Sequence, residues 1–301
     1  MEKTGTLPPV ALVGLGGMGA AIGHRLLDKG CALTVFNRTA AKAAPLAAAG
    51  AAVAADAESC LSAARTVLIS LSDEQAVAEV LLDRVALVPT GTLVIDTSTV
   101  SPTFARAAAG RLAAAGVRRL EACVVGNPFQ ARNGELRVLV AGDPADLEQA
   151  RPVLDVLAAA VIPLGRPGNA SVMKLVFNLL LGAQVAGLAE AVSYGTAAGL
   201  DRDFLLRAIG GSGFSSRVLS FRAELMAERR YAPAAFRSAL MYKDLALGIQ
   251  EARAAGVELP VLGRVAERFA AMVDGGDGDL DAAAVIELQQ RDLGGPGETL
   301  T

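Results

Sequence analysis

The sequence predicts two domains, an α/β domain with a mostly parallel sheet followed by an all-helical domain. Over the first 165 residues, short apolar runs alternate with Ala-rich segments of helical length. That alternation is typical of βαβ units, whose helices cover both faces of a parallel sheet. Beyond the breaker cluster Gly165-Arg-Pro-Gly168, helical periodicity continues with almost no strand signal. We therefore expect one domain over residues 1–166 and a second over residues 167–301.

The elements of the first domain follow from its apolar runs and helix-start signals. Asp73 and Ser101-Pro102 are typical of helix N-termini. Strands are expected over residues 10–13, 33–36, 66–70, 93–96, 119–125 and 136–141. Helices are expected between them, over residues 17–29, 39–50, 73–82 and 102–116.

The composition excludes several classes of protein. With 52% hydrophobic residues and a net charge of −3, the chain lacks the basic excess that nucleic acids or anionic membranes attract. The single histidine, His24, excludes a histidine-cluster metal site. Cys31, Cys60 and Cys123 lie far apart without CxxC spacing, so we expect neither a disulfide framework nor a metal site. Few cysteines and no secretory-type apolar leader favour the cytoplasm.

An apolar stretch over residues 171–192 has the length of a membrane span. It contains Lys174, Asn178 and Gln184, which are costly in hydrocarbon, so we expect a buried helix of a soluble protein. Its apolar residues cover more faces than one small helical domain can bury, which predicts a homodimer.

A glycine-rich motif directly follows the first expected strand. In that strand–turn–helix context, G-x-G-x-x-G predicts a Rossmann dinucleotide-binding domain, with the phosphates at the helix N-terminus. The predicted cofactor loop is Gly14-Leu15-Gly16-Gly17-Met18-Gly19. Ser70 and Leu71, at the end of the expected strand over residues 66–70, are also assigned to the cofactor site.

The residues at the end of the second expected strand indicate whether the site prefers NAD(H) or NADP(H). An NAD site places Asp or Glu there, whereas this chain has Asn37-Arg38-Thr39. No carboxylate repels a 2′-phosphate, and a guanidinium with two neutral groups can hold it. The sequence therefore predicts NADP(H) in preference to NAD(H).

Hydride reduction of a carbonyl needs a proton donor. His24 lies on the helix that opens the cofactor site and is expected to be structural, which disfavours dehydrogenases that use a histidine. Short-chain dehydrogenases use the pattern Tyr-x-x-x-Lys, and none of the three tyrosines in this chain is followed by a lysine four residues later. Elimination leaves Lys, Asp or another Tyr.

Lysine is scarce, since five of the 28 basic residues are lysines. Lys174 lies with Ser171, Asn178 and Gly182 on one narrow stripe of an otherwise apolar helix. Such a stripe faces a polar cavity or a partner, and partial burial lowers a lysine pKa toward the working range of an acid–base group. Lys174 is therefore the candidate acid–base group, and the alternative is a lysine at the domain edge whose ammonium reaches solvent.

Together these residues resemble the β-hydroxyacid dehydrogenase family, which includes 3-hydroxyisobutyrate dehydrogenase and glyoxylate and succinic semialdehyde reductases. Four ordered blocks carry the resemblance: Gly14 to Gly19, Ile95-Asp-Thr-Ser98-Thr99-Val-Ser-Pro102, Gly165 to Asn178, and Tyr242-Lys243-Asp244-Leu245.

The resemblance assigns roles to residues of the later blocks. It implies that Ser98 and Thr99 lie beside the nicotinamide and that Lys174 is catalytic, with Asn178 positioning the substrate. It also implies that Lys243 reaches the cofactor, that Asp244 organises the cleft, and that the protein is a homodimer.

One block departs from the family. The family's substrate loop usually reads Asp-Ala-Pro-Val-Ser-Gly-Gly, whereas residues 121–128 read Glu-Ala-Cys-Val-Val-Gly-Asn-Pro. Val125 removes a hydroxyl donor, while the backbone of Gly126 and the side chain of Asn127 are candidates to bind the substrate's polar tail. Asn127 is equally suited to a turn before Pro128. Phe214, Tyr231 and Phe236 are candidates for the pocket or for the core.

The expected function is interconversion of a small aldehyde or keto acid with its hydroxy acid or alcohol. Imine reductases share the architecture, and their cofactor segment often reads Asn-Arg-Thr, so reduction of an imine or ketimine is the alternative. Lys174 favours carbonyl chemistry, because an ammonium is poorly placed beside an iminium.

Overall fold

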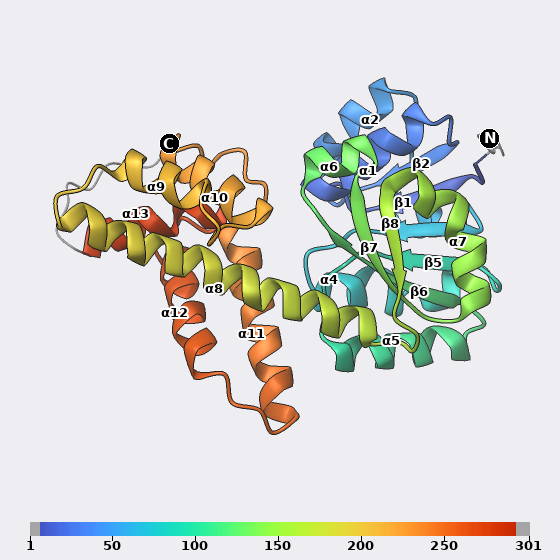
Figure 1. The fold of residues 1–301 in the computed structure, drawn as a ribbon. Coiled ribbons are helices and arrows are strands. Elements are labelled where there is room, and N and C mark those ends of the chain that lie inside the picture. Colours follow the sequence, from blue (N-terminus) through green and yellow to red (C-terminus); the bar gives the residue numbers. More distant parts are fainter. Residues whose placement is uncertain (1–6, 293–301) are drawn as a thin grey trace. The chain divides into compact units, whose positions relative to one another are not determined.

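The first of two compact units is built on a single eight-stranded sheet (Figure 1). A computed structural model describes residues 7–292, and the chain divides into Met1–Lys174 and Leu175–Thr301. The strand order is β3-β2-β1-β4-β5-β6-β7-β8, with every neighbouring pair parallel except β6 and β7. The strands are β1 (Val10–Val13), β2 (Leu33–Phe36), β3 (Ala52–Val53), β4 (Thr66–Ile69), β5 (Leu93–Asp96), β6 (Arg118–Val125), β7 (Leu136–Ala141) and β8 (Ala158–Pro163).

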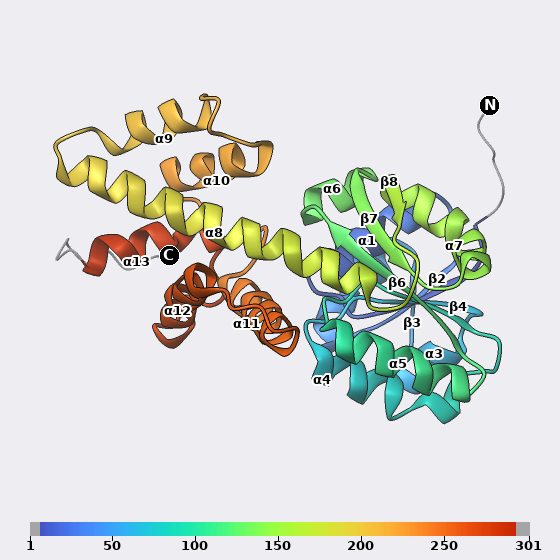
Figure 2. The ribbon, with the colours of Figure 1, turned by 60° about the horizontal axis from the view of Figure 1, so that its bottom comes forward.

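Helices cover both faces of this sheet (Figure 2). One face packs against α1 (Gly17–Asp28), α2 (Ala44–Ala48), α6 (Pro128–Asn133) and α7 (Pro144–Leu157). The other packs against α3 (Ala57–Ser62) and α5 (Pro102–Ala114), and Val77 of α4 (Glu74–Val77) belongs to a smaller buried cluster with Ala105 of α5. The buried strands read as continuous apolar runs because both of their faces are covered. The predicted fold class, a Rossmann-type domain followed by an all-helical domain, is confirmed.

Two strands escaped the sequence prediction, and both lie at edges of the sheet. β3 is two exposed residues long, too short to give a periodic signal. β8 begins where α7 ends, and its Ala-Ala-Ala start reads as a continuation of that helix. The expected helix over residues 39–50 is a 3₁₀ turn, Ala40–Ala43, followed by α2. The expected helix over residues 73–82 passes from α4 into a π-helical turn, Ala78–Leu82.

Over the described residues of the second unit, every regular element is a helix, and one isolated β-bridge joins Arg237 to Asp281. The helical elements are the C-terminal part of α8 (Asn169–Ala197), α9 (Arg202–Gly210), α10 (Arg217–Ala227), α11 (Ser238–Ala254), α12 (Pro260–Asp274), the 3₁₀ turn Ala282–Ala284 and α13 (Val285–Asp292). Helices α8 and α11 cross closely at Gly182, where a Cβ atom would lie 2.9 Å from the Leu245 side chain. The core of this unit gathers around Phe269, Met226 and Val192.

Helix α8 buries its polar stripe and exposes aliphatic side chains. It is long and apolar enough to cross a membrane by length and composition, and 44% of its apolar window is buried in the structure. Ser171 and Asn178 are buried and Lys174 is half-buried, whereas Val172 and Leu180 are exposed. Asn178 is paired with a side chain of α11, so α8 packs as an element of a helical unit.

A buried ionic cluster joins α9 to α13 in the second unit. Arg202 donates to Glu287 at 2.6 Å, and the Tyr231 hydroxyl donates to the same carboxylate. Burial raises the pKa of Tyr231, and its hydrogen bond to Glu287 raises it further. The phenol is therefore a fixed, neutral donor of the core.

Candidate active site

The glycine-rich loop leaves an open space at the N-terminus of α1. Gly14 has φ +95°, and a Cβ atom on Gly19 would lie 2.0 Å from the Gly14 carbonyl oxygen, so larger residues cannot replace them. A Cβ atom on Gly16 would meet no atom within 4 Å, and no side chain caps α1. The first turn of α1 also lacks acidic residues. This uncapped helix end, bordered by open space, fits a dinucleotide pyrophosphate.

Asn37 ties the glycine-rich loop to the end of β2. Its side-chain oxygen accepts from the Leu15 backbone N–H at 2.9 Å, and its amide donates to the Thr39 carbonyl at 3.0 Å. Arg38 is exposed, and within residues 7–292 no ion pair or hydrogen bond holds its guanidinium. Asn37 therefore shapes the loop, whereas Arg38 is free to meet a ligand.

The loops after β4 and β5 are joined by side-chain hydrogen bonds. The Ser98 hydroxyl accepts from the Leu71 backbone N–H at 3.1 Å, and the Ser98 N–H donates to Asp96 at 3.0 Å. Ser70 lies against the first glycine, since a Cβ atom on Gly14 would lie 2.2 Å from its carbonyl oxygen. Parallel neighbouring strands bring these loops to the carboxyl edge of the sheet, where ligands of such folds bind.

Glu121, in β6, accepts hydrogen bonds from the start of α8. Its carboxylate accepts from the Gly168 backbone N–H, from the Ser171 N–H at 3.2 Å and from the Ser171 hydroxyl at 3.0 Å. These bonds anchor the first turn of α8 to the sheet.

Lys174 lies one turn into α8, at the end of the first unit. Burial raises the pKa of the Cys123 thiol to about 12, and the Lys174 charge acts against this rise. The Cys123 sulfur lies 4.0 Å from the Ser98 carbonyl oxygen. Because Ser171 bonds to Glu121, two residues before Cys123 in β6, the turn of α8 that carries Lys174 starts beside the strand segment that contacts Ser98.

The predicted substrate loop begins the short helix α6. The Asn127 side chain accepts from the Gln130 backbone N–H at 2.9 Å, and the Gln130 side chain accepts from the Asn127 N–H at 3.0 Å. In this capping box the Asn127 side-chain oxygen is occupied by the Gln130 N–H, so the side-chain N–H groups of Asn127 are the ones that can donate to a ligand. Val125 ends β6, and Gly126 follows with φ +144°.

In the second unit, the structure brings together Asn178, Lys243 and Asp244. The Asn178 amide donates to Asp244 Oδ2, and Lys243 Nζ lies 3.0 Å from Asp244 Oδ1. Asp244 Oδ1 is buried, and Lys243 is its ion-pair partner.

Of the other candidate residues, Tyr231 and Phe236 belong to the core of the second unit, whereas Phe214 lies on the surface. Burial, and then the Arg132 charge, lower the pKa of His24. Tyr231 lies in the buried cluster with Glu287, Phe236 packs against the core, and Phe214 is 94% exposed. Within residues 7–292, no cluster of His, Cys, Asp and Glu is suited to a metal ion.

The buried charges Asp96, Arg119 and Glu121 were not predicted as site residues. Arg119 donates to Asp96 at 2.8 Å and lies 3.6 Å from Glu121. All three side chains are at most 2% exposed. Ionisable residues inside apolar strand segments were the available signal, because burying an unpaired charge is costly.

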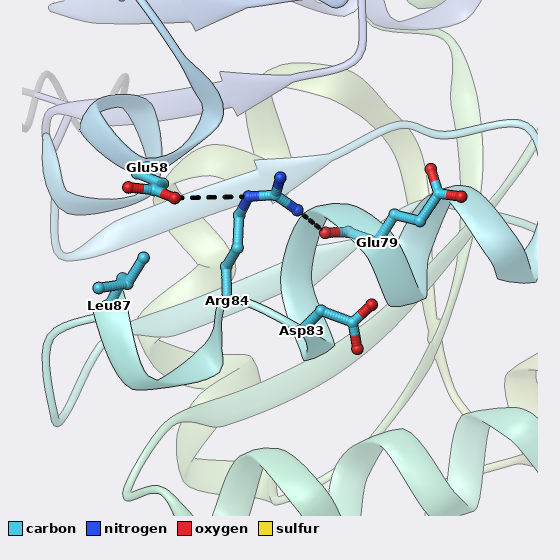
Figure 3. Close-up of a pocket in the computed structure, with 5 residues that line it drawn as sticks. All are labelled: Glu58, Glu79, Asp83, Arg84 and Leu87. Carbon is cyan, nitrogen blue, oxygen red and sulfur yellow. Dashed lines mark hydrogen bonds and ion pairs between the residues drawn. The ribbon is translucent and has the colours of Figure 1, made fainter.

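An open hollow lies elsewhere on the first unit, between α3 and the segment after α4 (Figure 3). Its lining is mostly acidic, and Arg84 lies 3.8 Å from Glu58 and donates to the Glu79 carbonyl oxygen. No predicted site residue lines it.

Two family models match the chain, one for each domain. Residues 9–165 match the NAD-binding domain of 6-phosphogluconate dehydrogenase. Residues 168–289 match the NAD-binding region of NADP-dependent 3-hydroxyisobutyrate dehydrogenase.

Curated relatives match along nearly their whole length. Glyoxylate/succinic semialdehyde reductase 1 of Arabidopsis thaliana is 31% identical, over 92% of this chain and 97% of its own. NAD-dependent L-serine dehydrogenase of Pseudomonas aeruginosa is 32% identical, over 93% and 97%.

Solved structures of similar proteins share this fold along nearly the whole chain. The Mycobacterium tuberculosis 3-hydroxyisobutyrate dehydrogenase with L-serine is 30% identical, with a TM-score of 0.83 over 94% of this chain and 99% of that one. An imine reductase of Streptomyces aurantiacus is 28% identical, with a TM-score of 0.64 over 93% and 99%.

Fold, glycine-rich loop and matches together define an NAD(P)-dependent oxidoreductase. The chain belongs to the β-hydroxyacid dehydrogenase family, the group of 3-hydroxyisobutyrate dehydrogenase and the glyoxylate and succinic semialdehyde reductases.

Proposed function

We propose that this protein is an NADP(H)-dependent enzyme that interconverts a small aldehyde or keto acid with the corresponding hydroxy acid or alcohol. The observation that carries the proposal is the position of Lys174, on a helix start that Glu121 anchors beside the strand segment that contacts Ser98. All of these residues belong to the same unit as the glycine-rich loop.

Gly14 to Gly19 would hold the pyrophosphate, and the loops carrying Ser70, Leu71, Ser98 and Thr99 would border the nicotinamide. Bound NADPH supplies the hydride that reduces the substrate carbon. Arg38 supports the choice of NADP(H), because an exposed guanidinium at the end of β2 can pair with a 2′-phosphate.

Lys174 would donate a proton to the alkoxide oxygen during reduction and accept it during oxidation. A lysine can perform both steps, whereas a guanidinium does not release its proton in proteins. Asn178 would orient the substrate, with Asp244 and Lys243 organising its surroundings.

The relatives and the loop after β6 support a small, carboxylate-bearing substrate. Glyoxylate, succinic semialdehyde and serine, which appear in the names of similar proteins, are small and carry a carboxylate. The Gly126 backbone and the free amide N–H groups of Asn127 would bind that carboxylate in place of the hydroxyl that Val125 lacks.

Reduction of an imine is the second candidate. The similarity to the Streptomyces aurantiacus imine reductase and the segment Asn37-Arg-Thr favour it. Lys174 argues against it, because an ammonium repels an iminium.

The exposed face of α8 supports a homodimer. Val172, Val176 and Leu180 are 47%, 42% and 58% exposed and recur every four residues, which places them in one row. A second copy of the chain would cover this row. The three free, buried cysteines suit a reducing compartment and support the cytoplasm as the location.

A substrate panel tests the proposal. The purified protein is assayed with NADPH and NADH against glyoxylate, succinic semialdehyde, 3-hydroxyisobutyrate in the oxidative direction, and a cyclic imine. We expect NADP(H)-linked turnover of a carbonyl or hydroxy acid, and a loss of about 100-fold to 10,000-fold in kcat for Lys174→Ala. Lys29→Ala, at the exposed C-terminal end of α1, is the control. Faster turnover of the imine, or full activity of Lys174→Ala, would overturn the assignment.

A further inference from the structure

The buried carboxylate of Glu121 uses both of its oxygens to hold the start of α8. Oε1 accepts from the Gly168 N–H, and Oε2 accepts from the Ser171 N–H and hydroxyl. The N-terminus of a helix carries a partial positive charge, so a buried carboxylate there is stabilised. Lys174 follows Ser171 by three residues, so these bonds fix the turn that carries it.

Arg119 lies two residues before Glu121 on the same face of β6 and connects it to Asp96. Register pairs Asp96 with Glu121 on neighbouring strands, so two carboxylates lie side by side. Arg119 separates them, donating to Asp96 at 2.8 Å and lying 3.6 Å from Glu121. It also donates to the Ala105 carbonyl of α5 at 3.2 Å. Burial alone would lower the pKa of Arg119, but the two carboxylates outweigh it and raise that pKa.

Asp96 completes the chain of contacts. Its second oxygen accepts from the Ser98 N–H at 3.0 Å, and the Ser98 hydroxyl accepts from the Leu71 N–H at 3.1 Å. One continuous set of buried hydrogen bonds and ion pairs thus runs from the loops after β4 and β5 to the first turn of α8. All of its members belong to the first unit.

We propose that Glu121 and Arg119 are positioning residues, which hold Lys174 in a fixed place relative to the loop carrying Ser98. This inference rests on the proposed function, in which Lys174 transfers the proton and Ser98 borders the nicotinamide. A displacement of about 1 Å in a reacting group lowers a rate by about 100-fold. The buried ion pairs keep the start of α8 in place, because separating a buried charge from its partner would leave that charge uncompensated.

Glu121→Gln tests the role with little change in shape. One end of the amide is a donor, so the Gly168 and Ser171 N–H groups cannot both keep an acceptor. We expect kcat to fall about 10-fold to 100-fold while the NADPH dissociation constant, measured by fluorescence titration, changes by less than about threefold. Ser171→Ala, which removes a single donor, is the milder second variant and should lower kcat by about threefold to tenfold.

Asp143→Ala is the matched control. It removes an N-cap carboxylate, which accepts from the Ala145 N–H at 2.8 Å at the start of α7 in the same unit. Its melting temperature should fall while kcat stays within about twofold of the wild type, because α7 carries no proposed site residue.

A double-mutant cycle with Lys174→Ala separates positioning from general stability. If Glu121 acts through Lys174, adding Glu121→Gln to Lys174→Ala should change the residual rate by less than about twofold. Full kcat in Glu121→Gln, or an equal loss in both backgrounds, would overturn the positioning role and leave the proposed function intact. Full activity of Lys174→Ala would overturn both. If Glu121→Gln does not fold, the same cycle is run with Ser171→Ala.

Discussion

Asn178 on α8 donates a hydrogen bond to Asp244 on α11, and both side chains are buried in the helical unit. The carboxylate therefore sets the orientation of the amide that is proposed to orient the substrate. Lys243, next to Asp244 in the chain, forms an ion pair with it at 3.0 Å. Asp244 on α11 thus orients Asn178 on α8, and Lys243 contacts Asp244.

Replacing Asp244 should weaken both stability and substrate binding. Asp244→Ala leaves the buried Asn178 amide without its acceptor, which costs about 1–3 kcal/mol in the free energy of unfolding. The KM for the substrate should rise as the amide loses its fixed orientation. Urea denaturation and steady-state kinetics measure the two effects. Asp274→Ala, at the exposed end of α12, is the control, and equal stability of the two variants would contradict the role.

Gly16→Ala should separate cofactor binding from folding. The backbone at Gly16 has φ −67°, which alanine adopts freely, and its Cβ atom would meet no protein atom within 4 Å. The added methyl group would instead occupy the space assigned to the pyrophosphate. We expect an unchanged melting temperature without cofactor and NADPH affinity lowered by about tenfold or more. Gly110→Ala, an equally open helical position in α5, is the control: it should leave NADPH affinity unchanged and raise the melting temperature, because alanine favours a helix over glycine. Normal NADPH affinity of Gly16→Ala would refute this position for the pyrophosphate.

Arg38→Ala should discriminate between the two dinucleotides. A guanidinium–phosphate pair contributes about 1.5–3 kcal/mol, so NADPH affinity should fall by about tenfold to 100-fold. NADH affinity should stay nearly constant, because NADH lacks the 2′-phosphate. Titrations of the variant with both cofactors measure the difference, with Lys29→Ala as the control. Equal losses for NADPH and NADH would show that Arg38 does not bind the phosphate.

Site residues could be predicted from the sequence where their contacts are local, and could not where their partners lie far away along the chain. The glycine-rich loop could be recognised because its geometry depends on neighbouring residues, such as the contact between Gly14 and Gly19. The role of Glu121 could not, because its partners Gly168 and Ser171 lie 47 and 50 residues away along the chain. Asn127 was ambiguous for the opposite reason, since its cap to Gln130 is a local contact that many asparagines make.

The fold shows the same division. Six strands have enough apolar residues to be recognised, whereas β3 has two residues and β8 is an edge strand that begins with alanines. Alanine carries little strand preference, so only pairing with β7 makes residues 158–163 extended.

Leu180→Glu should dissociate the proposed dimer. Leu180 is 58% exposed in the row with Val172 and Val176, so its replacement costs little within one chain. A carboxylate buried against a second copy would be costly. Sedimentation velocity should show monomers for Leu180→Glu and dimers for the wild type. Val53→Glu, on the edge strand β3, is the control, and should leave the oligomeric state unchanged. A wild-type monomer would contradict the proposal.

Glu287 should make the stability of the helical unit sensitive to acid. Burial alone would raise the pKa of Glu287, but hydrogen bonds from Arg202 and Tyr231 outweigh it and hold the pKa below its ordinary value of 4.5. The folded state therefore binds this proton less readily than the unfolded state. The resulting stabilisation is fully present above pH 4.5 and is lost as the pH falls toward the lower pKa of the folded protein.

Glu287→Gln should be less stable than the wild type at neutral pH, because it leaves Arg202 buried without its carboxylate. Its stability should also fall less steeply below pH 4.5, since the titrating group is gone. Urea denaturation of both proteins from pH 7 to pH 3 measures the two slopes. Glu267→Gln, an exposed partner of Arg264 on α12, should follow the wild-type slope. Parallel slopes for Glu287→Gln and the wild type would show that Glu287 does not carry the acid sensitivity.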